Sequence, residues 1–112
     1  MKLPNARLAL VEREKITDYL LNAAHPDNGG KAEFFTSLGF QREEWEVLVR
    51  AFRGLAIATE VTESLESSHG MKYVVEGAIQ TPSGRVARVR TIWIVDRGRN
   101  CPRLVTAYPA ET

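Results

Sequence analysis

The sequence predicts an α+β domain in which two or three N-terminal helices pack on one face of a four-stranded antiparallel sheet. Two observations carry this prediction. Apolar residues recur with a helical period in the first half of the chain and with a strand period in the second. The chain of 112 residues has room for one hydrophobic core, so we expect a single domain over 1–112, with a helical half at about 12–56 and a sheet half at about 58–109.

Three helices are expected in the helical half. The first follows an extended segment over 7–11 and is predicted to end near Asn22, because Pro26 disfavours helical geometry at His25. Its buried face is predicted to hold Ile16, Tyr19, Leu20 and Ala23. The second is predicted over 31–38, followed by Gly39, a residue type suited to helix ends. The third is predicted over 42–56, with an apolar stripe made of Trp45, Leu48, Val49, Phe52 and Ala56.

The sheet half is expected to contain four strands, at 59–66, 72–80, 86–95 and 103–108. The first is rich in Thr, Val and Glu and is predicted to lie at an edge of the sheet. A tight turn joins the second and third strands, with Gly84 in the left-handed conformation. If this turn pairs Thr81 with Arg85, then Glu76 lies opposite Arg90.

That register gives the hairpin two different faces. The core face is predicted to carry Tyr73, Val75, Ile79, Val89, Thr91, Trp93 and Val95. The other face carries Lys72, Glu76, Arg88 and Arg90, with an apolar patch of Val74, Ile92 and Ile94 at one end. Such a face is either a binding cleft or a solvated surface, on which a cross-strand Glu76–Arg90 pair contributes only ~0.2–1 kcal/mol.

The net charge of +1 conceals an asymmetry along the chain. Positive and negative side chains cancel over residues 1–56, and the segment 57–70 contains three glutamates and no basic residue. From residue 71 onward, seven basic residues stand against three acidic ones, which is a local surplus of four positive charges. This surplus favours an anionic partner such as nucleic acid, although a solvated sheet edge decorated with arginines has the same composition.

Several classes of protein are disfavoured by composition. The longest apolar runs, such as 8–11, are far shorter than the ~20 residues of a membrane span, and the first residues lack a signal-peptide pattern. The single Cys101 rules out an internal disulfide and suits a reducing cytoplasm, where a structural thiol is favoured over a catalytic one. No group of His, Cys or carboxylate residues has metal-ligand spacing, so we expect neither a metal nor a cofactor.

His25 is the first candidate for chemistry because it lies in a turn, and an imidazole with its ordinary pKa of ~6.5 suits proton transfer. The alternative is a surface histidine, or one that caps a neighbouring backbone group. Gly29 and Gly30 precede a helix and expose amide groups to an anion, to which Lys31 adds a charge. The alternative for this glycine segment is a turn that only reverses the direction of the chain.

The candidate catalytic groups form a set that contains no metal ligands. Besides His25 and Lys31, this set includes the arginines on the strands and the hydroxyl groups of Thr91, Thr106 and Tyr108. Cleavage of RNA through its own 2′-hydroxyl needs such a set: one group moves a proton, cations stabilise the charge on phosphorus, and hydroxyls hold the phosphate.

Short motifs along nearly the whole chain resemble a family of small, mostly uncharacterised bacterial domains. They are Lys15–Asn22, His25–Pro26, Gly30–Phe35 and Leu38–Phe40 in the helical half, and Lys72–Gly77, Arg88–Trp93 and Leu104–Pro109 in the sheet half. Such domains are similar to the superfamily that groups barnase, EndoU, the tRNA-cutting colicins and RelE, in which helices precede a four-stranded antiparallel sheet.

The resemblance implies a toxin-type, metal-independent endoribonuclease that acts on RNA such as tRNA or mRNA and is held inactive by a small cognate antitoxin. It implies that His25 is the general acid or base and that Lys31 is an electrostatic stabiliser. It also implies that Arg90 binds the scissile phosphate and that Thr106 holds a phosphate oxygen. Further contacts with substrate are expected from Lys72, Arg88, Thr91 and Tyr108.

A second class of function fits the same residues. A non-catalytic domain of this fold would dock another protein through the edge strand at 59–66 or through the apolar patch of Val74, Ile92 and Ile94. The complex of such a domain with its partner would form whether or not His25 and Lys31 were mutated. An antitoxin that covers the cleft would reconcile the two functions.

Overall fold

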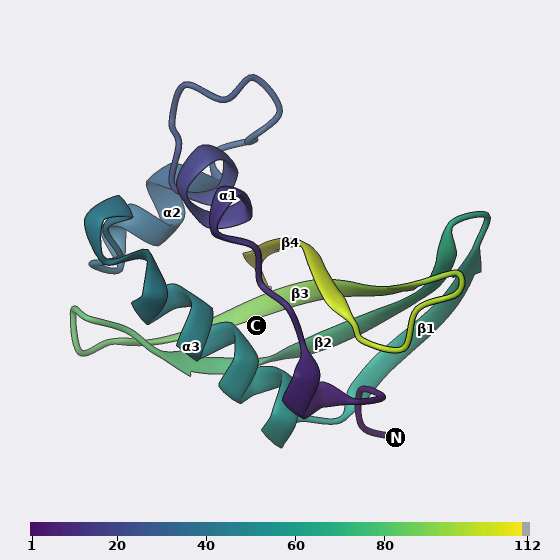
Figure 1. The fold of residues 1–112 in the computed structure, drawn as a ribbon. Coiled ribbons are helices and arrows are strands. Elements are labelled where there is room, and N and C mark those ends of the chain that lie inside the picture. The colour runs from purple at the N-terminus through teal and green to yellow at the C-terminus, as the bar shows by residue number, and fades with distance from the viewer. Residues whose placement is uncertain (111–112) are drawn as a thin grey trace.

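The computed structural model describes residues 1–110 and has helices on one face of a four-stranded antiparallel sheet (Figure 1). The predicted fold class is confirmed. Each strand pairs with the next one along the chain, so the order in the sheet is β1-β2-β3-β4. The strands are β1 (Val61–Ser67), β2 (Gly70–Gln80), β3 (Val86–Asp96) and β4 (Arg103–Pro109), all within a few residues of their predicted positions.

The helical half differs from the prediction in its first element. The helices are α1 (Arg13–Lys15), α2 (Lys31–Ser37) and α3 (Trp45–Ala58), with short turns η1 (Ala6–Leu8), η2 (Ile16–Leu20) and η3 (Arg42–Glu44). η2 is a π-helical turn that continues α1, and it closes with a bond of 2.8 Å from the Leu21 N–H to the Ile16 carbonyl. Because the helix ends there, Ala23 lies outside it and is exposed rather than buried as predicted.

The register of the central hairpin is the predicted one. Gly84 has φ of +86° and its N–H donates to the Thr81 carbonyl at 3.0 Å, as the three-residue loop requires. Glu76 therefore lies opposite Arg90, and alternate residues of β2 and β3 face the helices.

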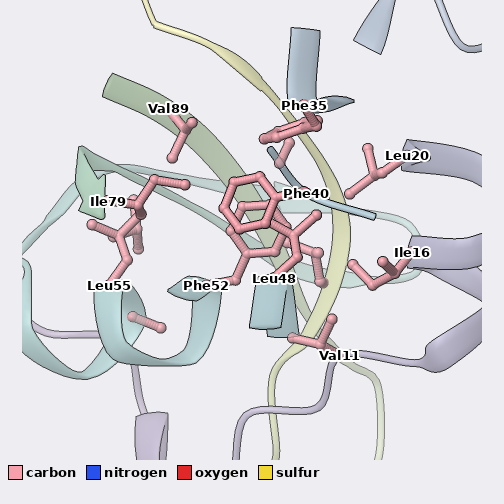
Figure 2. Close-up of a cluster of buried hydrophobic side chains, with 14 of the residues drawn as sticks. Val11, Ile16, Leu20, Phe35, Phe40, Leu48, Phe52, Leu55, Ile79 and Val89 are labelled. Atoms are coloured by element: carbon pink, nitrogen blue, oxygen red, sulfur yellow. The ribbon is translucent and has the colours of Figure 1, made fainter. Parts of the chain in front are cut away.

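The core lies between the helices and the sheet (Figure 2). Leu48, Phe52 and Ala56 of α3 are fully buried, whereas Trp45 and Val49 of the predicted stripe are half-buried. On the sheet, the buried side chains facing the helices include Val75, Ile79, Val89, Thr91 and Trp93. Tyr73 and Val95 complete the predicted face but are only half-buried.

The predicted apolar patch on the other face is not an exposed surface. Val74 and Ile94 keep only 8% and 3% of their surface accessible, and Ile92 is half-buried. Ile94 pairs with Lys72 on one side and with Arg103 on the other. The aliphatic stems of such long side chains can cover apolar neighbours, which is consistent with the low exposure of Ile94.

The N-terminal segment covers the beginning of β4. It was predicted to be extended over 7–11, but η1 takes up its first residues. Leu10 then makes a parallel bridge to β4, accepting a bond from the Leu104 N–H at 2.9 Å. The far end of β4 is approached instead by α1 and α2 (Figure 1). None of the helices in residues 1–110 has the length and apolar character needed to cross a membrane.

Candidate functional site

The ammonium group of Lys31 joins side chains from three distant parts of the chain. Its Nζ donates to the Tyr19 hydroxyl at 2.5 Å and to the Thr106 hydroxyl at 3.0 Å. The Tyr19 and Thr106 oxygens are themselves 3.3 Å apart. Lys31 Nζ also lies 5.9 Å from the centre of the Tyr108 ring. We call Lys31, Tyr19 and Thr106 the Lys31 cluster.

The cluster lies at the rim of the edge strand β4. Ala107 is fully buried and pairs with Thr91 of the core face. Because side chains alternate along a strand, Thr106 and Tyr108 point to the opposite, open face of the sheet. Lys31 and Tyr19 belong to the helical layer, and they reach Thr106 around the edge of β4. The cluster therefore opens onto the sheet face opposite the helices of residues 1–110.

Backbone geometry and one buried side chain hold Lys31 in place. Gly29 and Gly30 have φ of +65° and +84°, which the left-handed region allows most readily for glycine, and α2 begins at Lys31. Asn28 is only 4% exposed. Its amide donates to the Tyr19 carbonyl at 2.6 Å, and its oxygen accepts from the Ala32 N–H at 2.9 Å. Asn28 thus ties the turn that carries Tyr19 to the helix that carries Lys31.

The surroundings of Tyr19 change its acidity. Burial alone would raise the pKa of Tyr19, but the hydrogen bonds of Lys31 and Thr106 and the charges of Lys31 and Lys15 together lower it below its usual value of about 10. Lys15 Nζ lies 5.4 Å from the centre of the Tyr19 ring. The phenolate form of Tyr19 is therefore stabilised by cations from two helices.

His25 lies beside the cluster, with its ring edge-to-face against Tyr19 at 5.0 Å between centroids. Its Nδ1 accepts a bond of 3.1 Å from the Asp27 N–H. A backbone N–H is always a donor, so this bond places the proton of a neutral ring on Nε2. Nδ1 must release Asp27 before it can take up a proton. A hollow of about 340 Å³ adjoins the ring, lined by Glu12, Glu14, Lys15, Asp18, Tyr19 and His25.

Arg90 lies next to the cluster across the sheet, since its partner in the β3–β4 register is Tyr108. Two glutamates hold its guanidinium: Glu76 of the neighbouring strand β2 at 3.9 Å, and Glu63 of β1, one strand further away, at 3.3 Å. Its Nε is buried and has no hydrogen-bond partner among residues 1–110. A hollow of about 350 Å³ lies here, lined by Glu76, Arg90, Tyr108, Pro109 and Ala110.

The remaining predicted contact residues are not brought into the cluster. Thr91 is fully buried; its hydroxyl donates to the Val75 carbonyl at 2.7 Å and accepts from the Trp93 ring N–H at 2.8 Å. It therefore has no surface from which to touch a substrate. Within residues 1–110, Lys72 and Arg88 make no side-chain hydrogen bond to the Lys31 cluster; they lie on β2 and β3.

Tyr19 is the site residue that the sequence alone did not indicate. Its spacing from Ile16 and Leu20 fits a buried helix face, so it was assigned to the core, and in the structure it does pack partly against the core. The π-helical turn, a feature often found at functional sites, was not visible in the sequence. Within residues 1–110, no three His, Cys, Asp or Glu side chains gather closely enough to hold a metal ion.

The fold and the site define a small α+β domain with a half-buried, lysine-centred polar cluster at the edge of the sheet. Residues 2–111 match the family described as Domain of unknown function (DUF6883), and the chain belongs to that family. No curated protein matches the chain.

A solved structure shares the fold. It is described as a contact-dependent growth inhibition toxin–immunity protein complex from Klebsiella pneumoniae 342. The matched chain superposes with a TM-score of 0.76 at 16% sequence identity, and the alignment covers 96% of this chain and 97% of the other. At this identity the likeness establishes a common fold.

Proposed function

We propose that this domain is a toxin-type endoribonuclease that cleaves RNA without a metal ion, with the Lys31 cluster as the centre of its active site. The observation that carries the proposal is the ammonium group of Lys31 held between two hydroxyl groups at the rim of an open sheet face. The fold shared with a protein of a toxin–immunity complex supports it.

The chemistry follows from the groups present. In RNA the 2′-oxygen attacks the adjacent phosphorus, the bond from phosphorus to the 5′-oxygen breaks, and the products end in a 2′,3′-cyclic phosphate and a 5′-hydroxyl. Lys31 stabilises the negative charge that grows on the phosphate oxygens. Thr106 donates to one of those oxygens, and His25 contributes its Nε2–H to the phosphate. RNA supplies its own nucleophile, so no metal-bound water is needed to generate one.

Arg90 and Tyr108 extend the proposed site across the open face. Lys72, Arg88 and Arg90 of the strands belong to the segment after residue 70, whose surplus of positive charge favours an anionic partner such as RNA. Arg90 binds the RNA backbone beside the scissile phosphate, and Tyr108 offers a ring on which a base stacks, a contact worth about 1–3 kcal/mol per base. A small immunity-type protein is the proposed partner, and it inhibits by covering the same face.

The test compares four purified proteins on total bacterial RNA in EDTA: wild type, Lys31→Ala, Thr106→Val and Lys2→Ala. We expect discrete cuts by the wild type and a loss of about 10²–10³-fold in rate for Lys31→Ala, as when one charge-stabilising donor is removed from an active site. Thr106→Val keeps the shape of the side chain but loses its hydroxyl, and it is also expected to slow cleavage.

Lys2→Ala is the matched control, because Lys2 is exposed and the variant loses the same charge outside the site. An equal loss of cleavage rate in Lys2→Ala and Lys31→Ala would show that the effect comes from the change in net charge. Cleavage by Lys31→Ala at the wild-type rate would contradict the proposal.

A second function is favoured by the other edge of the sheet. β1 is exposed along most of its length, and Leu65 keeps 59% of its surface accessible. Edge strands of this kind accept a further strand from a partner. A non-catalytic protein-binding domain would therefore form a stable complex through β1, with or without Lys31. Folded wild type that cuts no RNA, and a complex lost on Leu65→Lys but kept in Lys31→Ala, would support this second function.

A further inference from the structure

We propose that Tyr19 is the general acid of the cleavage reaction and protonates the departing 5′-oxygen of the RNA. This inference rests on the proposed function and adds a catalytic residue to it. It concerns a residue that the sequence placed in the hydrophobic core and that the structure places against Lys31.

The hydrogen bonds of Tyr19 leave its proton available. An ammonium group only donates, so the Tyr19 oxygen accepts from Lys31. Thr106 also accepts from Lys31. In the 3.3 Å contact between the Tyr19 and Thr106 hydroxyls either one can donate. No partner within the cluster therefore requires the phenolic proton, and it can be given to an oxygen placed on the open face. Once the proton has left, the Lys31 bond remains and stabilises the phenolate.

The other titratable groups around Tyr19 are less suited to this role. Lys31 and Lys15 favour the phenolate, and the lowered pKa of Tyr19 agrees with that arrangement. His25 packs against the Tyr19 ring, but its Nδ1 is engaged by the Asp27 N–H, so the doubly protonated form that would serve as an acid has to break that bond. Glu12, Glu14 and Asp18 line the same hollow as Tyr19 and His25, but within residues 1–110 none of them hydrogen-bonds to the Tyr19 hydroxyl.

The proton balance of the step is simple. The 2′-oxygen forms a bond to phosphorus and gives its proton to a solvent water. The bond between phosphorus and the 5′-oxygen breaks, and that oxygen takes the proton of Tyr19. The Tyr19 phenolate then recovers a proton from solvent, so the enzyme returns to its starting state and no water is consumed.

The test uses two versions of an oligoribonucleotide that carries a cleavage site mapped for the wild type. One has the natural 5′-oxygen at the scissile position, and the other has sulfur in its place. A thiolate leaves without help from an acid, so the sulfur substrate removes the need for Tyr19. Tyr19→Phe keeps the ring and loses only the hydroxyl. Tyr73→Phe is the matched control, because Tyr73 packs against the core on β2.

We expect Tyr19→Phe to cut the oxygen substrate about 10²–10⁴-fold more slowly than the wild type and to cut the sulfur substrate at nearly the wild-type rate. His25→Ala is expected to slow both substrates by a similar factor, and Tyr73→Phe to slow neither. Equal slowing of both substrates by Tyr19→Phe would overturn the role of general acid while leaving the ribonuclease in place. Wild type that cuts neither substrate would overturn the proposed function, and the inference with it.

Discussion

Lys31 and Tyr19 each change what the other can do. The ammonium group lowers the energy of the phenolate, and the hydroxyl fixes the ammonium group over β4. Neither residue type is unusual in a small domain, and neither gains a function from its position in the sequence alone. The function proposed for them comes from the hydrogen bonds that bring them together with Thr106.

The first prediction concerns the ionisation of Tyr19. In Lys31→Met, Tyr19 keeps its burial but loses a hydrogen bond and the nearer positive charge, so its pKa is expected to rise from its lowered value toward or above about 10. The phenolate absorbance of Tyr19, obtained as the difference between each protein and its Tyr19→Phe version, measures this pKa. An unchanged titration in Lys31→Met would show that the contact with Lys31 does not set the acidity of Tyr19.

The elements that carry the cluster are short, and they are joined by the side chain of Asn28. This residue has 4% of its surface exposed and bonds to the backbone of both η2 and α2. Asn28→Ala leaves the Ala32 N–H without its partner, and it removes one of the two donors to the Tyr19 carbonyl, which keeps the Asn22 N–H at 3.2 Å. We expect the free energy of unfolding to fall by about 1–3 kcal/mol.

Urea unfolding measures this loss, and Asn100→Ala serves as the control because Asn100 is exposed in the β3–β4 loop. A surface substitution of that kind is expected to stay within about 0.5 kcal/mol of wild type. RNA cleavage by the folded Asn28→Ala protein is also expected to slow, since Lys31 and Tyr19 lose their common anchor. Full stability together with full activity in Asn28→Ala would contradict the role given to this residue.

Among the secondary-structure elements, the strands were easier to predict from the sequence than the first helix. Gly84 and the turn around it determined the register of β2 against β3, so the pairing of Glu76 with Arg90 followed from sequence alone. The π-helical turn of η2 depends on tertiary packing of Ile16 and Leu20, both fully buried, and no local pattern distinguishes it from an α-helix. For that reason the position of Tyr19 was missed, while those of Lys31 and Thr106 were anticipated as candidates.

Over the whole molecule, the sheet presents two very different faces. One packs against the helices, and the other is open and has the Lys31 cluster at its β4 rim and Arg90 toward its middle. The sequence placed Arg88, Arg90 and Lys72 on the open face and Thr91 on the core face. Thr91 is buried as alternation predicts, and its hydroxyl bonds to Val75 and Trp93 instead of facing a substrate. On the open face, alternation alone was a poor guide to exposure. Val74 and Ile94, expected to be exposed, are covered.

The central claim is that this open face cleaves RNA through the 2′-hydroxyl of the substrate. The most direct measurement is the chemical identity of the RNA ends produced in EDTA, together with the effect of a single 2′-deoxy residue at the mapped cleavage site. We expect 2′,3′-cyclic phosphate and 5′-hydroxyl ends, and no cutting of the 2′-deoxy substrate. Cleavage that persists at the 2′-deoxy position, or that leaves 5′-phosphate ends, would contradict it.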